Sequence, residues 1–247
     1  MTTYKLTISY LGSPFHGFAR QPDTLTVQGE LERALSTVLR EKIETVCAGR
    51  TDTGVHARRQ VVSFESRAHA LGIERSLNAL THDGISVKEI EVAKSNFSAR
   101  FDAKWREYRY FICNSQTPPI FSSQFSWHVK KPLDTGKIKE ACPYLIGEHD
   151  FKSFCLAASA QDKNTVREIF SIDVFTEHIF GEELLCVRVV GNAFLHSMIR
   201  AIVGTLCDIG KGNKCPEDFK AILEAKNRSA AGENAPPQGL VFWHVEY

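Results

Sequence analysis

One polar segment of the chain, residues 49–60, has the composition of a reactive loop: GRTDTGVHARRQ. It contains a single carboxylate, Asp52, with a glycine on either side and Arg50 two residues before it. A neighbouring guanidinium lowers the pKa of a carboxyl group and keeps it ionised, as a nucleophile or a charge-stabilising group requires. Because Asp-Thr-Gly also closes many ordinary loops, the segment by itself leaves a catalytic and a structural interpretation open.

Asp-Thr-Gly is also the triplet of aspartic proteases, but its surroundings here argue against that class. Such enzymes use two carboxylates that share one proton, and one of the two needs a raised pKa. Asp52 follows Gly-Arg-Thr, not the apolar pair that would bury a carboxylate dyad. The cation of Arg50 opposes a raised pKa. We therefore reject an aspartic protease.

Hydrophobic periodicity predicts the elements that position this loop. Strands are expected over residues 4–10, 43–48, 60–65, 85–93, 106–113, 166–175, 184–190 and 240–247, and helices over 27–39, 69–80, 134–146, 193–209 and 216–226. The first helix has Thr24 or Thr26 as its cap and Glu32 outside its apolar face. The order is roughly β-α-β-β-α-β twice. It predicts an α+β fold of two related units, 1–103 and 104–247, forming a central, mainly antiparallel sheet with helices packed on it.

The composition is that of an ordinary globular protein. The 247 residues are 43% apolar and 24% charged, and 30 basic against 29 acidic residues give a net charge of +1. Any anionic ligand must therefore be met by a local basic surface. The start of the chain lacks a signal-peptide pattern, and no apolar run approaches the roughly 20 residues that span a bilayer. With seven scattered cysteines, typical of a reducing compartment, these features predict a soluble cytoplasmic protein.

The predicted strand 106–113 carries a candidate for base recognition. It places Arg106, Tyr108 and Tyr110 on one face, because alternate residues of a strand share a side. A tyrosine beside an arginine suits stacking on a splayed-out base with a grip on phosphate. Core packing is the alternative, and it is the better account of Tyr110.

Arg200 is unusual because it lies in the otherwise apolar stretch 195–206. A cation buried there without a carboxylate partner costs several kcal/mol. We therefore expect an acid beside Arg200, and Asp52 is the natural candidate.

Weaker signals remain in the rest of the chain. Arg100 lies among aromatic residues in the segment 97–101, and His56 follows Asp52 by four residues. For His56 a contact with RNA and a purely structural role stay open. The nine histidines form no metal-binding pair or cluster with cysteine, and no glycine-rich phosphate loop is present. We therefore predict no metal and no nucleotide cofactor.

Five blocks of the chain resemble the tRNA pseudouridine synthase A family. They are residues 49–57 (GRTDTGVHA), 97–101 (FSARF), 106–110 (REYRY), 147–154 (GEHDFKSF) and 192–204 (NAFLHSMIRAIVG). The blocks occur in the family's order and extend over almost the whole chain.

The resemblance implies isomerisation of uridine to pseudouridine at positions 38 to 40 of the tRNA anticodon stem-loop. It also implies a homodimer that needs no cofactor and has the pseudouridine synthase fold with a basic cleft. By residue-to-residue matching, Asp52 is the catalytic aspartate, Arg50 takes the place of the extruded base, Tyr108 stacks on the target uracil, and Arg200 pairs with Asp52. Further residues expected at the RNA are His56, Arg58, Arg100 and Arg20.

The chain departs from the family pattern at four places. Thr53 replaces the usual Ala, Phe18 replaces a Trp, and the segment 80–85 lacks the common Leu-Pro. Arg58 and Arg59 stand where smaller residues are frequent. The last two departures concern loops that contact the substrate, not the chemistry.

Three alternatives remain open at this point. The carboxylate can attack C1′ of the ribose, or it can take the 2′ proton in a glycal route. A non-catalytic RNA-binding protein would have the same basic cleft. A glycosidase would need a second acid at a suitable spacing, and the loop around Asp52 supplies none.

Overall fold

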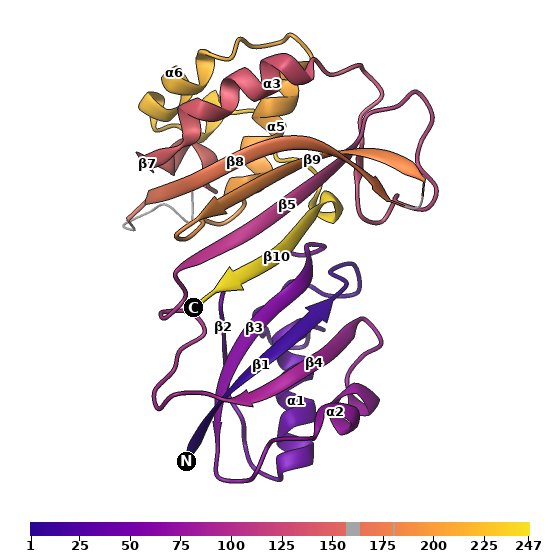
Figure 1. Cartoon of the computed structure of the whole chain (residues 1–247), viewed down its shortest axis with the longest axis vertical. Helices are drawn as coiled ribbons and strands as arrows, with labels where there is room; N and C mark the ends of the chain where they lie inside the picture. The colour runs from indigo at the N-terminus through magenta and orange to yellow at the C-terminus, as the bar shows by residue number, and fades with distance from the viewer. Residues whose placement is uncertain (157–163, 180) are drawn as a thin grey trace. The chain divides into compact units, whose positions relative to one another are not determined.

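The computed structural model describes residues 1–156, 164–179 and 181–247, which form two compact units (Figure 1). The first unit comprises Met1–Lys104 with Val241–Tyr247, and the second comprises Trp105–Leu240. The first unit was expected to end at residue 103 and ends at Lys104. The closing strand, however, belongs to the first unit and not to the second. It does so because Val241 and Phe242 pair with strand residues His56 and Ala57.

The first unit has the predicted order β-α-β-β-α-β. Its elements are β1 (Thr2–Tyr10), α1 (Val27–Leu39), β2 (Thr45–Cys47), β3 (His56–Ser66), α2 (Glu74–Leu80) and β4 (Ile85–Val92), joined by β10 (Leu240–Glu246). The strands are ordered β4-β1-β3-β10, and β2 also pairs with β3. All of these pairings are antiparallel except β10 with β3.

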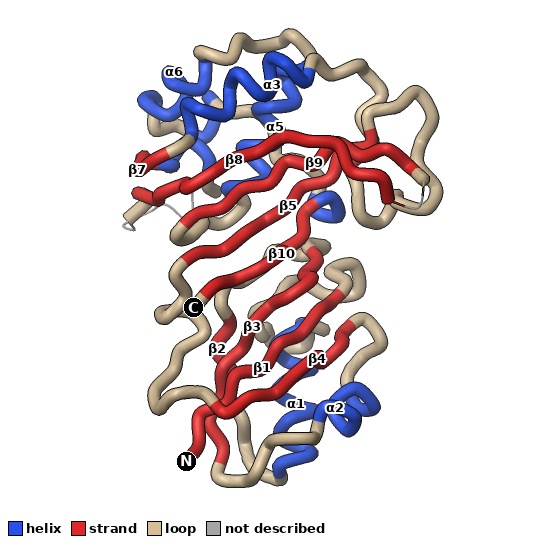
Figure 2. Tube along the Cα trace, in the orientation of Figure 1, coloured by secondary structure: helices blue, strands red, loops and turns tan. Residues whose placement is uncertain are grey.

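Helix α1 begins where predicted, because the side chain of Thr26 accepts a hydrogen bond from the backbone N–H of Gly29 at 3.2 Å. Its apolar face is buried, and α1 runs behind the strands of this unit in Figure 2. The burial of Leu31 and Leu35 stabilises the unit by about 1.5–3 kcal/mol each. Helix α2 begins five residues later than predicted, because Gly72 adopts a left-handed φ of 79°.

The second unit contains β5 (Trp105–Cys113), β6 (Trp127–His128), α3 (Thr135–Ala141), β7 (Gly147–Asp150), β8 (Val166–Ile179), β9 (Glu182–Gly191), α5 (Met198–Gly210) and α6 (Asp218–Ala225). Short 3₁₀ helices lie at Cys142–Leu145, Phe151–Phe154, Arg228–Ala230 and Pro237–Gly239. The strands are ordered β5-β9-β8-β7, with β6 parallel to β5. The α+β class and the mainly antiparallel pairing are confirmed in both units.

Two predicted helices of the second unit are shorter than expected. The helix predicted over 134–146 ends at Ala141 and continues as a 3₁₀ turn, whose second residue is Pro143. The helix predicted from residue 193 begins at Met198, because Ser197 adopts a left-handed φ of 59°. Strands β6 and β7 are too short to give a periodic signal in the sequence.

Among the helices of the described residues, none combines the length and the apolar character needed to cross a membrane.

Candidate functional site

The loop that carries Asp52 joins β2 to β3 and is fixed by buried polar groups on the neighbouring strands. Thr51 shares a hydrogen bond of 2.8 Å between its Oγ1 and the hydroxyl of Tyr10, at the end of β1. Gln60 of β3 donates from Nε2 to the carbonyl oxygen of Gly49 at 2.7 Å. Asp52 itself is half-buried, and its carbonyl accepts from the N–H of Val55 at 3.1 Å. The carboxylate is thus presented on a loop anchored at both ends.

The hydroxyl of Tyr10 is kept neutral in this arrangement. Burial raises the pKa of Tyr10 well above its ordinary value, although the hydrogen bonds with Thr51 and Gln60 oppose the rise. The phenol therefore remains a hydrogen-bonding anchor for the loop over the physiological pH range.

A second segment, residues 11–18, packs its backbone directly against the loop of Asp52. A Cβ at Gly12 would lie 2.3 Å from the carbonyl oxygen of Val55, so only glycine fits there. Gly17 has a φ of 89°, which favours glycine, and its neighbour Phe18 donates its N–H to the carbonyl of Thr51 at 3.1 Å. Both glycines permit a backbone-to-backbone contact that larger residues would prevent.

His56 is part of the same contact. It is buried, and its Nδ1 accepts a hydrogen bond from the backbone N–H of Gly12 at 3.0 Å. This bond favours the structural role that the sequence left open, and it requires the neutral form of the ring to carry its proton on Nε2. A contact of His56 with RNA stays a prediction.

Two of the predicted RNA-binding arginines lie close to one thiol. Burial raises the pKa of Cys47 to about 11, and the charges of Arg50 and Arg100 oppose this rise. The side chains of Arg50 and Arg100 are exposed. The guanidinium of Arg100 lies over the ring of Phe101, with 5.3 Å between Cζ and the ring centroid. Arg50 and Arg100 thus concentrate positive charge at the end of β2, where the loop of Asp52 begins.

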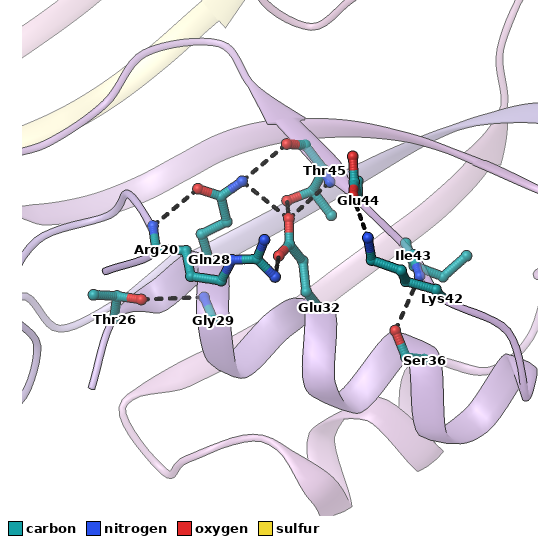
Figure 3. A network of polar contacts seen from close by, with 10 residues as sticks. All are labelled: Arg20, Thr26, Gln28, Gly29, Glu32, Ser36, Lys42, Ile43, Glu44 and Thr45. Atoms are coloured by element: carbon teal, nitrogen blue, oxygen red, sulfur yellow. Dashed lines mark hydrogen bonds and ion pairs between the residues drawn. The ribbon is translucent and has the colours of Figure 1, made fainter. Parts of the chain in front are cut away.

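Arg20 belongs to a polar network that also holds α1 to β2 (Figure 3). Its centre is Glu32, whose side chain is only 6% exposed. One carboxylate oxygen of Glu32 accepts from Thr45 N, Thr45 Oγ1 and Gln28 Nε2 at 2.9–3.0 Å. The other has no aligned hydrogen-bond donor among the described residues, but it lies 3.2 Å from Nη1 of Arg20. Glu32 was expected outside the apolar face of its helix, yet it is buried because β2 covers that side.

The Arg20 side chain is 58% exposed despite this ion pair. It therefore serves as the counter-ion of a buried carboxylate while leaving part of its guanidinium in contact with solvent. The expected contact of Arg20 with RNA is compatible with that exposure.

In the second unit, Tyr108 lies on β5 between Arg106 and Tyr110. The residue is 7% exposed, and its ring meets the ring of Phe194 edge to face, at 5.1 Å between centroids. Arg106 donates from Nη1 to the carbonyl of Asn192 at 2.6 Å. Tyr110 is fully buried and donates its hydroxyl to the carbonyl of Pro236 at 2.7 Å, as expected of a core residue.

Arg200 lies in the first turn of α5 and is half-buried. Arg200 is less enclosed than the sequence suggested, because α5 begins at Met198 and Arg200 lies near the N-terminal end of this helix. Its Nε donates to the carbonyl of Ala235 at 2.7 Å, and Ala235 N donates back to the carbonyl of Arg200 at 3.0 Å. A cation in a first turn opposes the helix dipole, so helix stability alone does not explain an arginine at this position.

Asp-Thr-Gly occurs a second time in the chain, as Asp134, Thr135 and Gly136. There Asp134 is the N-cap of α3, and its side chain accepts from the N–H of Lys137 at 3.1 Å. The second triplet is a helix cap, so the repeat gives no support to a protease dyad. In the part of the chain that the structure describes, no three His, Cys, Asp or Glu residues gather as a metal site.

Comparison with known proteins decides the family. The tRNA pseudouridine synthase family model matches residues 6–102 and 141–247. The chain belongs to this family. It is 44% identical to tRNA pseudouridine synthase A of Bacillus velezensis, over 98% of both chains. It is 43% identical to that of Francisella tularensis subsp. holarctica, over 100% of this chain and 95% of the relative. The chain is thus a member of a family of RNA-modifying isomerases.

Among solved structures, the chain is similar to the archaeal box H/ACA sRNP Nop10–Cbf5 complex. The TM-score is 0.38 and the identity 15%, over 83% of this chain and 43% of that one.

The residues that hold the loop of Asp52 in place give little signal in the sequence. Tyr10, Gln60 and Gly12 are distant from Asp52 in sequence or belong to strand patterns. The one available signal was Gln60, a polar residue at the start of an apolar strand. A fully buried amide needs partners, and the loop supplies one of them, the carbonyl of Gly49.

Gly12→Ala should separate the two packed backbones and displace the loop of Asp52. We expect kcat for pseudouridine formation to fall roughly hundredfold, since a displacement near 1 Å has that effect, with a loss of about 1–3 kcal/mol in stability. Steady-state assays and urea unfolding measure the two effects. Ser13→Ala, at the exposed neighbouring position, should change neither. An unaltered kcat in Gly12→Ala would contradict the role assigned to this contact.

Glu32→Ala should leave the N–H and hydroxyl of Thr45 and the amide of Gln28 without their shared acceptor. Loss of such buried partners costs about 1–3 kcal/mol, which urea unfolding would detect. Glu44→Ala, which removes a surface ion pair with Lys42, should have little effect, because exposed ion pairs contribute little to stability. Equal losses of stability in the two variants would show that the buried network of Glu32 stabilises the protein no more than a surface ion pair does.

Proposed function

We propose that the chain isomerises uridine in the anticodon stem-loop of tRNA, at positions 38 to 40, with Asp52 as the essential carboxylate. The observation that carries the proposal is the anchored loop: in a chain of this family, the loop that carries one carboxylate is held by Tyr10, Gln60 and the backbone of residues 11–18. Rigid presentation of a single charged group is what a positioned catalytic residue requires.

The reaction is redox-neutral and its atoms balance without a cofactor. In one route, a carboxylate oxygen of Asp52 attacks C1′ as the C1′–N1 bond breaks, and the uracil leaves with the electron pair. After the base turns, C5 attacks C1′ and releases the carboxylate; C5 then loses its proton and N1 gains one. In the other route, Asp52 takes the proton from C2′ as the C1′–N1 bond breaks, which gives a glycal and the uracil anion. After the base turns, C2′ regains the proton from Asp52 as C1′ bonds to C5, and C5 then loses its proton while N1 gains one. Both routes need Asp52 ionised and return it unchanged.

The target uridine must leave the helical stack before either route can begin, at a cost of a few kcal/mol. We propose that Tyr108 stacks on the extruded uracil, since stacking on an aromatic ring contributes about 1–3 kcal/mol. The edge-to-face contact with Phe194 would fix the plane of that ring. Arg50, exposed two residues before Asp52, would occupy the space that the base leaves.

We also propose that Arg200 is the counter-ion that keeps Asp52 ionised. Its unfavourable position in a helix first turn, and the backbone bonds that tie it to Ala235, support a role beyond packing. Arg20, Arg58 and Arg100, all exposed, would supply the local basic surface for tRNA. We propose that the working form is a cytoplasmic homodimer.

A non-catalytic RNA-binding protein is the alternative, and Asp52→Asn separates the two. This nearly isosteric change should abolish pseudouridine formation while altering tRNA affinity less than about threefold. Release of tritium from tRNA that contains 5-tritiated uridine measures turnover, and substitution of each uridine at 38, 39 and 40 locates the target. Thr53→Ala, the residue usual in the family, should remain active. Turnover by Asp52→Asn would refute the assignment.

Arg200→Lys tests the counter-ion, because lysine retains charge but loses the planar guanidinium. We expect kcat to fall at least tenfold, with KM little changed, because the paired N–H donors of the guanidinium are lost. Lys220→Ala, an exposed change on α6, is the control. An unchanged kcat would exclude this role for Arg200.

A further inference from the structure

Strand β3 carries two consecutive exposed arginines at a β-bulge. In its pairing with β1, Tyr10 lies opposite Ala57 and Ile8 lies opposite Gln60. Two residues of β3, Arg58 and Arg59, therefore stand against one residue of β1. Both side chains are exposed, although the residues on either side of the pair are buried. Bulges of this kind redirect side chains and are frequent beside active sites.

One of the two guanidinium groups is supported by an aromatic ring. β10 runs parallel to β3, with Phe242 opposite Ala57, so the next residue, Trp243, lies beside Arg58. The Cζ of Arg58 lies over the indole ring, 4.7 Å from its centroid. Trp is the best of the aromatic rings for this contact, and the half-buried indole gives it a fixed support.

This arrangement has the chemistry of a phosphate-binding site. A guanidinium that stacks through its face retains N–H donors along its edge, and two of these match the oxygens of a phosphate. Support by the ring reduces the side-chain entropy lost when the phosphate binds. Arg59 adds a second positive charge on the same bulge. A chain with a net charge of +1 can attract an anionic polymer only through such local concentrations.

The bulge is also close in sequence to the reactive loop. Arg58 follows Asp52 by six residues, so their Cα atoms are separated by at most about 22 Å. Arg50 and Arg100 concentrate charge at the other end of the same loop. A polyanion bound at this loop would therefore meet several arginines, as expected for RNA more than for a short acidic peptide.

We propose that Arg58, oriented by Trp243, and Arg59 bind backbone phosphates of tRNA that flank the target nucleotide. The inference rests on the proposed function, since it assumes that tRNA is the substrate. It assigns Trp243 as a positioning residue, which acts through Arg58 and needs no contact with the RNA.

The test is equilibrium binding of unmodified tRNA to the full-length protein at several KCl concentrations. Arg58→Ala and Arg59→Ala should each weaken binding roughly tenfold near 0.1 M salt. Each should also reduce the magnitude of the negative slope of log K against log[KCl] by about one, because one phosphate contact is lost. Arg75→Ala, at an exposed position on α2, is the matched control and should change neither. An unchanged affinity and slope in the Arg58→Ala/Arg59→Ala double variant would overturn the proposal.

A double-mutant cycle tests the role of Trp243. Trp243→Leu should weaken tRNA binding about threefold to tenfold in the wild-type background and have little effect once Arg58 is Ala. Trp243→Phe, which keeps a weaker ring, should give an intermediate loss and decides the question if the leucine variant does not fold. Losses that simply add would exclude a positioning role for Trp243.

The same measurements separate this inference from the proposed function. If the unaltered protein neither binds tRNA nor forms pseudouridine, the proposed function fails. If it does both while the Arg58, Arg59 and Trp243 variants behave like Arg75→Ala, only the inference fails.

Discussion

The geometry of the reactive loop depends on a contact between two stretches of backbone. Residues 11–18 press against residues 51–55 so closely that a side chain at Gly12 would coincide with the carbonyl of Val55. Such a contact has little freedom to adjust, because protein interiors are packed nearly as densely as molecular crystals. Tyr10 and Gln60 fix the same loop from the neighbouring strands. The position of Asp52 is therefore determined by main-chain packing together with the hydrogen bonds of two buried side chains.

Charge in the first unit is arranged in two different ways. Glu32 and Arg20 form a partly buried pair that connects α1, β2 and the loop before α1. The remaining arginines around the loop are exposed, and two of them lie over aromatic rings, Arg58 on Trp243 and Arg100 on Phe101. Exposed ion pairs contribute little to stability, whereas exposed arginines held by a ring remain available to an anion. The first arrangement supports the fold, and the second suits binding of a polyanion.

The two units support different parts of the proposed chemistry. The first presents the carboxylate and most of the basic residues, while the second presents Tyr108 with its ring partner Phe194 and the helix that carries Arg200. Each group is fixed within its own unit by bonds to the backbone or by ring contacts.

The sequence by itself determined the α+β class, most helices and strands, and the family. It did so because each long element repeats its apolar residues with the period of a helix or a strand, and because the five family blocks lie in local runs of residues. Tertiary structure decided what local patterns do not contain. It assigned β10 to the first unit, buried Glu32 under β2, moved the start of α5 to Met198, and placed Trp243 beside Arg58. Each of these depends on which residues meet after the chain has folded back on itself, and contacts between residues as far apart as 58 and 243 leave no periodic trace in the sequence.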